Sequence, residues 1–203
     1  MKRLHEPADL AAAAAGLLDH LGPVTGLRAG LHPEHPHGVR LLDQTGRPYT
    51  DDVAPVDRIG AALGAPVDHQ HHGPLSESMV TGTWQGTSVH ASHLYSHVSD
   101  GAYPSKPCTD PADVLGRRLR ALVPWLQQPW AQQAESVHVY DETGAPLVHV
   151  VLRTTDSLDE ALGALLDATG PLQYRAERKH DDVAHGSVLL GDGTVVTASV
   201  ITP

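Results

Sequence analysis

The chain has no phenylalanine and no asparagine, and its 203 residues include a single cysteine, Cys108. One cysteine cannot form a disulfide within the chain, which fits a reducing compartment. No apolar run reaches the roughly 20 residues that a membrane-spanning helix needs. Acidic Glu6 and Asp9 accompany the apolar run Leu10–Leu18, whereas the segment before the apolar run of a secretion signal is basic. The sequence therefore predicts a soluble, cytoplasmic protein.

Positive charge is scarce as well. The chain has 14 Lys and Arg against 24 Asp and Glu, which gives a formal net charge of −10. An acidic surface repels nucleic-acid phosphates and anionic lipids, and the sequence has no basic patch to offset this repulsion. We therefore expect neither nucleic-acid nor membrane binding, and the charge favours a protein partner with a basic surface.

The signatures of common enzyme classes are also missing. The sequence has no GxSxG nucleophile elbow, no phosphate-binding P-loop, no GxGxxG fingerprint and no HExxH zinc motif. Gly191-Asp192-Gly193 is interpreted as a hairpin turn, because a strand rather than a helix follows it. These absences favour a binding protein over an enzyme and leave the question of enzymatic activity open.

What the sequence does contain is a segment that occurs twice. Gly86–Leu94 recurs as Gly193–Ile201, with five of nine positions identical and a separation of 107 residues. Asp43–Pro48 matches Asp141–Pro146 at a separation of 98 residues, and two shorter matches lie between these in the same order. Ordered self-similarity of this kind predicts a tandem duplication.

Hydrophobic periodicity, capping residues and turn residues predict a similar series of elements in each half. In the first half we expect a helix at 9–21, a short strand within 24–31, a hairpin of 39–43 with 49–53, a helix at 55–63, and strands at 67–72, 79–84 and 87–98. In the second half we expect a helix from 111 that Pro124 and Pro129 kink or divide near Val123, a hairpin of 137–140 with 147–152, a helix at 157–170, and strands at 172–178, 183–190 and 194–202.

These elements predict an α+β fold, a tandem duplication of a helix–hairpin–helix–antiparallel-strands unit. The helices should pack on an antiparallel sheet, with the two copies related by a pseudo-twofold axis. We place the first, histidine-rich repeat at 1–98, a linker rich in chain-breaking residues at 99–110, and the second repeat at 111–203.

Histidine distinguishes the two halves, because 11 of the 15 histidines precede residue 100. Residues two or four apart on a strand share a face, so His69 pairs with His71, and His93 with His97. These four are the predicted metal ligands, with Zn²⁺ as the candidate ion and Asp68 or Glu77 as a further ligand. The remaining histidines of the three groups fall at His32, His35 and His37, interpreted as an exposed polar loop, and at His72 and His90.

Two hypotheses follow from these patterns. The first is a non-enzymatic binding protein that recognises a protein partner, as inhibitors, immunity proteins and dedicated chaperones do. The alternative is a small metal- or histidine-dependent enzyme with its site in the first repeat, where a histidine would act as metal ligand or general base. Solvent-facing histidines with no such role are a third interpretation of the same pattern.

Overall fold

The computed structural model describes residues 4–22, 24, 26–43, 54–96, 114–140, 148–153, 175–180, 183–189 and 195–201. These residues form a mixed α+β fold, as predicted. The helices are α1 (Pro7–Leu21), α2 (Pro55–Leu63), α3 (Val114–Leu126) and the short 3₁₀ helix η1 (Pro129–Gln133). The strands are β1 (Leu27–Leu31), β2 (Val39–Asp43), β3 (Asp68–His72), β4 (Leu75–Trp84), β5 (Thr87–Ser96), β6 (Ala134–Tyr140), β7 (Val148–Arg153), β8 (Arg175–His180), β9 (Val183–Leu189) and β10 (Val195–Ile201).

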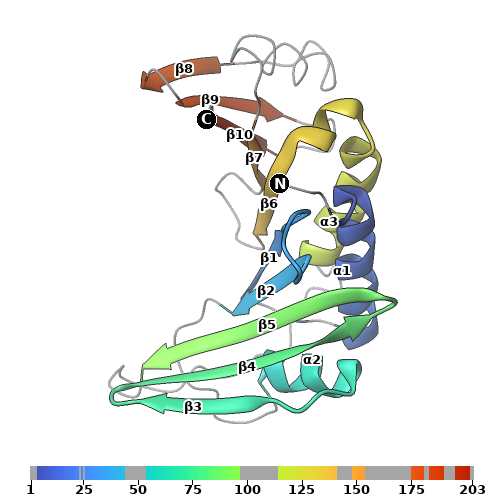
Figure 1. Ribbon diagram of the computed structural model, residues 1–203, viewed down its shortest axis with the longest axis vertical. Helices are drawn as coiled ribbons and strands as arrows, with labels where there is room; N and C mark the ends of the chain where they lie inside the picture. Colours follow the sequence, from blue (N-terminus) through green and yellow to red (C-terminus); the bar gives the residue numbers. More distant parts are fainter. Residues whose placement is uncertain are drawn as a thin grey trace.

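All ten described strands join in one sheet, in the order β3-β4-β5-β2-β1-β6-β7-β10-β9-β8 (Figure 1). The pairs β2–β5 and β7–β10 are parallel, and every other neighbouring pair is antiparallel. The prediction of a purely antiparallel sheet was therefore wrong at these two pairs. The first follows from the chain path, because a long connection that includes α2 separates β2 from β5 and lets the two strands run in the same direction.

The three α-helices pack on one face of the sheet. Alternate strand residues such as Ala29, Leu41 and Val139 are fully buried there and share a single core with Leu17 of α1 and Leu119 of α3. Helices α1 and α3 lie side by side, and α2 packs against β4 (Figure 1). None of the described helices is both long and apolar enough to cross a membrane.

Helix α3 follows its predicted pattern with one difference. Its buried side chains include Leu115, Leu119 and Leu122, which confirms the predicted apolar face. Of the two predicted outcomes near Val123, a kink or a division, the division does not occur, because the helix continues through Pro124 to Leu126. A proline this close to the C-terminal end removes only one helical hydrogen bond, and burial of the following Trp125 and Leu126 stabilises the last turn.

Strand β2 is paired differently from the predicted hairpin. It lies between β1 and β5, and its antiparallel partner is β1. The segment 49–53, the linker 99–110 with Cys108, and the helix predicted at 157–170 lie outside the described residues. The antiparallel pairing of β1 with β6 makes the sheet continuous between the two predicted repeats.

Candidate binding site

The sheet face opposite the three α-helices, here called the open face, carries a row of polar side chains. Strand register places Thr81, His90, Arg40, Gly30 and His138 side by side across five neighbouring strands. The residues that alternate with them point into the core, so the row faces away from it. No described α-helix covers this face. The strand pairing therefore gathers cationic and imidazole groups that are distant in the sequence.

A cavity of about 480 Å³ opens on this row. We call it the histidine–arginine pocket, after the side chains that dominate its wall. Its volume lies in the range of small-ligand sites. The residues that line it are Gly30, His32, His37, Arg40, Leu42, Thr81, His90, Ser92 and His138.

The loop between β1 and β2 supplies two of the pocket's histidines. It was predicted to be exposed, but His32, His35 and His37 are each only partly exposed. The His32 N–H donates to the Gly38 carbonyl at 2.7 Å, which closes the loop. The His32 ring lies over Gly30, where a Cβ atom would be 2.8 Å from His32 Nε2. The missing side chain at Gly30 therefore makes room for this ring.

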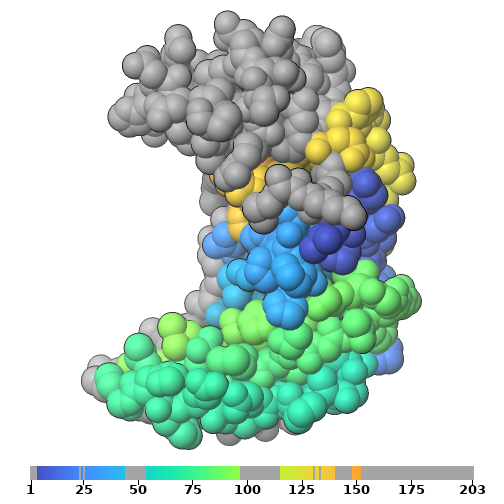
Figure 2. Space-filling model, in the orientation of Figure 1, coloured from blue at the N-terminus to red at the C-terminus, as the bar shows by residue number. Residues whose placement is uncertain are grey.

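Five imidazole rings form a continuous series along the pocket. Successive ring centroids are 5.5 Å apart for His138 and His32, 6.4 Å for His32 and His35, 5.5 Å for His35 and His37, and 5.8 Å for His37 and His90. Residues around β1 and β2 lie at the centre of the view in Figure 2, in light blue, above the green atoms of β4 and β5.

Hydrogen bonds to arginine determine how one ring is protonated. Arg28 Nη2 lies 2.9 Å from His138 Nδ1. Because a guanidinium only donates, this Nδ1 must accept. The proton of the neutral ring is then on Nε2, which lies 3.2 Å from the Ser136 hydroxyl oxygen and donates to it.

Burial and nearby positive charge keep these rings neutral. Burial lowers the pKa of His32 to about 4, and it lowers the pKa of His138 to about 4 as well. The cationic charge of Arg28 acts in the same direction on both rings. Both imidazoles are therefore neutral at pH 7. Further groups that lower one or both pKa values are Arg40, His35 and His149.

The pKa values of two more rings of the series are lowered by the same causes. Burial is also the main reason that the pKa values of His90 and His35 lie below the ordinary value, and Arg40 lowers both further. Among the described groups that shift the pKa values of these four rings, Glu77 is the one acid, and it raises the pKa of His90. The local potential is therefore positive, although the whole chain is acidic.

Three of the four predicted metal ligands, His69, His71 and His93, lie on the helix side of the sheet. Ring nitrogens of His69 and His71 lie 2.9 and 2.6 Å from the hydroxyls of Ser78 and Ser76, respectively, and His93 is only 1 % exposed. His93 is the cross-strand neighbour of Ser78. The described residues contain no group of three His, Cys, Asp or Glu side chains placed to hold a metal ion.

The carboxylates expected to complete the metal site face the other way. Asp68 and Glu77 alternate with the residues of the helix side and point to the open face. His97 lies outside the described residues, so the four-histidine zinc site remains a prediction.

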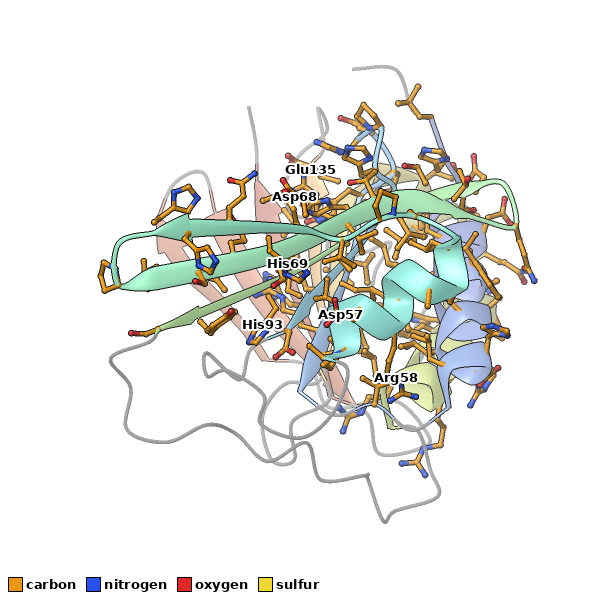
Figure 3. All side chains as sticks on the ribbon, turned by 90° about the horizontal axis from the view of Figure 1, so that it is seen from below. Asp57, Arg58, Asp68, His69, His93 and Glu135 are labelled. Atoms are coloured by element: carbon orange, nitrogen blue, oxygen red, sulfur yellow. The ribbon has the colours of Figure 1, made fainter. Side chains whose placement is uncertain are left out.

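Asp57 of α2 is the acid that does approach a predicted ligand (Figure 3). Its carboxylate lies 3.8 Å from His69 Nε2, and the opposite ring nitrogen faces Ser78. An acid, an imidazole and a hydroxyl in this order resemble the groups that activate a serine nucleophile. However, Ser78 is only 6 % exposed and the acid lies beyond hydrogen-bond distance. A substrate therefore has little access to this hydroxyl.

The histidines that converge differ from the predicted ligands, although the sequence contains one signal for them. His90 and His93 are three residues apart, and this spacing places them on opposite faces of a strand. His90 accordingly lies in the pocket, and His93 is buried on the helix side of the sheet. His138 and Arg40 have no local signal, because only the pairing of β1 with β2 and β6 brings them together.

Comparisons with known proteins add little to this description. No protein-family model matches the chain, and no curated protein matches it. One similar solved structure is a putative dioxygenase from Bacillus subtilis subsp. subtilis str. 168, with a TM-score of 0.26 and 8 % sequence identity. The match covers 72 % of this chain and 57 % of that chain. At this level of similarity the function has to be argued from the site alone.

Proposed function

We propose that this chain is a non-enzymatic binding protein that recognises a protein partner on the open face of its sheet. The histidine–arginine pocket at the centre of that face carries the proposal. Its imidazoles contact one another and hydroxyl or guanidinium groups, and among the described residues no acid is hydrogen-bonded to the His37 and His90 rings that face the Ser88 and Thr81 hydroxyls. Such an arrangement suits recognition better than a covalent reaction.

Exposed apolar side chains on the same face support a protein partner. Leu94 is 51 % exposed and Leu75 is 40 % exposed, and both alternate with buried residues of β5 and β4. They are two of the three large apolar side chains that are exposed in the described part of the chain. Apolar groups beside a polar pocket are common in protein interfaces.

The overall charge favours a particular kind of partner. A net charge of −10 steers basic proteins towards the chain and speeds their association at low ionic strength. Inhibitors, immunity proteins and dedicated chaperones act through such surfaces, and we place the chain in this functional class. Association should slow markedly as salt screens the charges.

We also infer that the chain arose by tandem duplication, with a pseudo-twofold axis between β1 and β6. Outward from these central strands the order is β1-β2-β5-β4-β3 on one side and β6-β7-β10-β9-β8 on the other. The parallel pair occupies the same place on each side, and residues Thr87–Leu94 of the recurring segment lie in β5 as Val195–Ile201 lie in β10. The match of Asp43–Pro48 with Asp141–Pro146 does not fit, because it would align β2 with β6.

Affinity capture followed by reconstitution tests the proposed function. The chain is used to isolate a partner from the cells of its source, and the dissociation constant is then measured with both proteins purified. We expect Leu94→Arg to weaken binding by about tenfold or more, since it places a charge in the apolar part of the interface. The matched control, Ala121→Arg on the exposed surface of α3, should leave binding unchanged. Equal effects of the two variants would contradict recognition through the open face.

A further inference from the structure

We propose that the histidine–arginine pocket binds an oxyanion, a carboxylate or phosphate group of the ligand, with Arg40 as its principal donor. This inference deepens the proposed function, on which it rests for the identity of the ligand as part of a protein partner. The binding of the oxyanion itself depends only on the pocket.

The charge of the pocket is positive and permanent. Arg40 of β2 lines it, Arg28 of the neighbouring strand β1 is hydrogen-bonded to its His138, and a guanidinium stays protonated at any physiological pH. The His32 and His138 rings are neutral at pH 7, so they add no positive charge to that of the guanidinium groups. These guanidinium charges oppose the binding of a metal cation in the pocket.

The pocket also has more hydrogen-bond donors than acceptors. His35 Nε2 lies 2.8 Å from Arg40 Nη2, and His35 Nδ1 lies 3.0 Å from the backbone N–H of His37. Both of these neighbours can only donate, whereas a neutral imidazole has a single acceptor nitrogen. One of the two donors therefore lacks an acceptor at any moment.

A second donor in the pocket lacks an acceptor too. Arg40 Nε is buried and has no hydrogen-bond partner among the described residues. An oxyanion beside Arg40 would accept from its guanidinium in place of His35, which would leave the His35 ring free to accept from His37. Oxygen acceptors with several lone pairs, as in carboxylates and phosphates, match the planar fork of arginine.

The remaining wall offers further donors and enough space. His32 makes ring contacts but no ring hydrogen bond among the described residues, so its N–H is available to a ligand. The Thr81 hydroxyl and the Ser92 hydroxyl also line the cavity. A volume of about 480 Å³ holds an oxyanion together with part of the molecule that carries it.

Histidine-ring NMR of the full chain tests the inference directly. Inorganic phosphate and acetate are titrated separately at pH 7, with sodium chloride adjusted to keep the ionic strength constant. We expect saturable shifts of the ring signals of His32, His35 and His138, while those of His69 and His71 on the helix side stay in place. The oxyanion that binds more tightly identifies the ligand group as phosphate or carboxylate.

Three arginine variants test the role of Arg40. Arg40→Gln should weaken anion binding by about tenfold or more, because charge-assisted hydrogen bonds are lost. Arg117→Gln, which removes the same charge from the exposed surface of α3, should leave it unchanged. Arg40→Lys keeps the charge without the planar fork and should bind with intermediate affinity. The wild-type shifts decide the question even if a substitution at Arg40 disturbs folding.

The outcomes separate this inference from the proposed function. Shifts spread equally over all histidine rings, or binding that Arg40→Gln does not change, would mean an adventitious ion only and would overturn the oxyanion site. If the pocket signals do not move but a partner is captured through Leu94, the oxyanion inference fails and the proposed function stands. If the pocket binds phosphate or acetate and no protein partner exists, the oxyanion site stands and the proposed function fails.

Discussion

The neutral histidines of the pocket should make the stability of the fold depend on pH in a specific window. The pKa values of His32 and His138 are lowered from 6.5 to about 4 in the folded chain. Above pH 6.5 both rings are neutral in the folded and unfolded states, so they contribute no pH dependence. As the pH falls from 6.5 towards 4, the unfolded chain binds protons that the folded chain does not, and the free energy of unfolding decreases.

The size of this effect follows from the same values. A pKa lowered from 6.5 to about 4 corresponds to roughly 3.4 kcal/mol per ring for a fully desolvated group. Because His32 and His138 are only partly buried, solvent screening reduces this to roughly 1 kcal/mol for each ring. The two rings together should therefore lower the free energy of unfolding by about 2 kcal/mol between pH 6.5 and pH 4.

Urea denaturation at several pH values measures this difference. The double variant His32→Gln/His138→Gln cannot take up these protons, so its free energy of unfolding should fall by about 2 kcal/mol less than that of the wild type. Glutamine keeps a hydrogen-bond acceptor for Arg28. Carboxylates titrate in the same range but are common to both proteins and cancel in the comparison. Identical pH profiles, or rings that titrate near 6.5 by NMR, would refute the reasoning.

Three further predictions concern the core, the loop and the ligand. Leu119→Ala in the fully buried face of α3 should lower the free energy of unfolding by about 3 kcal/mol, measured by urea denaturation. Gly38→Ala should lower the free energy of unfolding more than Gly30→Ala does. The new Cβ at position 38 would lie 2.5 Å from Leu10 Cδ2 in the core, whereas the Cβ at position 30 would meet the end of the partly exposed His32 side chain. A bound oxyanion should raise the pKa values of the pocket histidines, so its affinity should increase from pH 7 to pH 5, measured by NMR titration.

Much of the secondary structure could be predicted, because it depends on local pattern. Proline at the start of α2 and the glycine that follows the helix set its two ends, and its predicted range 55–63 is the observed one. The Gln85-Gly86 turn between β4 and β5 was also predicted. Both residues adopt a positive φ, a conformation that glycine favours. Strand partners are not local. Nothing near β2 in the sequence indicates that it runs parallel to β5 or lies between β5 and β1.

The pocket could not be predicted for the same reason. The metal hypothesis used the spacing of histidines within single strands, which identifies shared faces but not neighbouring strands. Arg40 and His90 become neighbours only through the parallel pairing of β2 with β5. His138 joins them through β6, from the other half of the chain. A site assembled from five strands and a loop has no linear motif.

The structure of the pocket is itself an argument for function. Partly buried imidazoles with lowered pKa values and donors without acceptors work against the stability of the fold, and proteins keep such groups mainly where a ligand uses them. If the two halves are copies, strand register makes His138, His149 and Thr197 the counterparts of Gly30, Arg40 and His90. The second copy then lacks both the space above Gly30 and the charge of Arg40. Among the described residues, the cavity and the Arg40 guanidinium that an oxyanion requires belong to the first copy, and β6 contributes His138 to them.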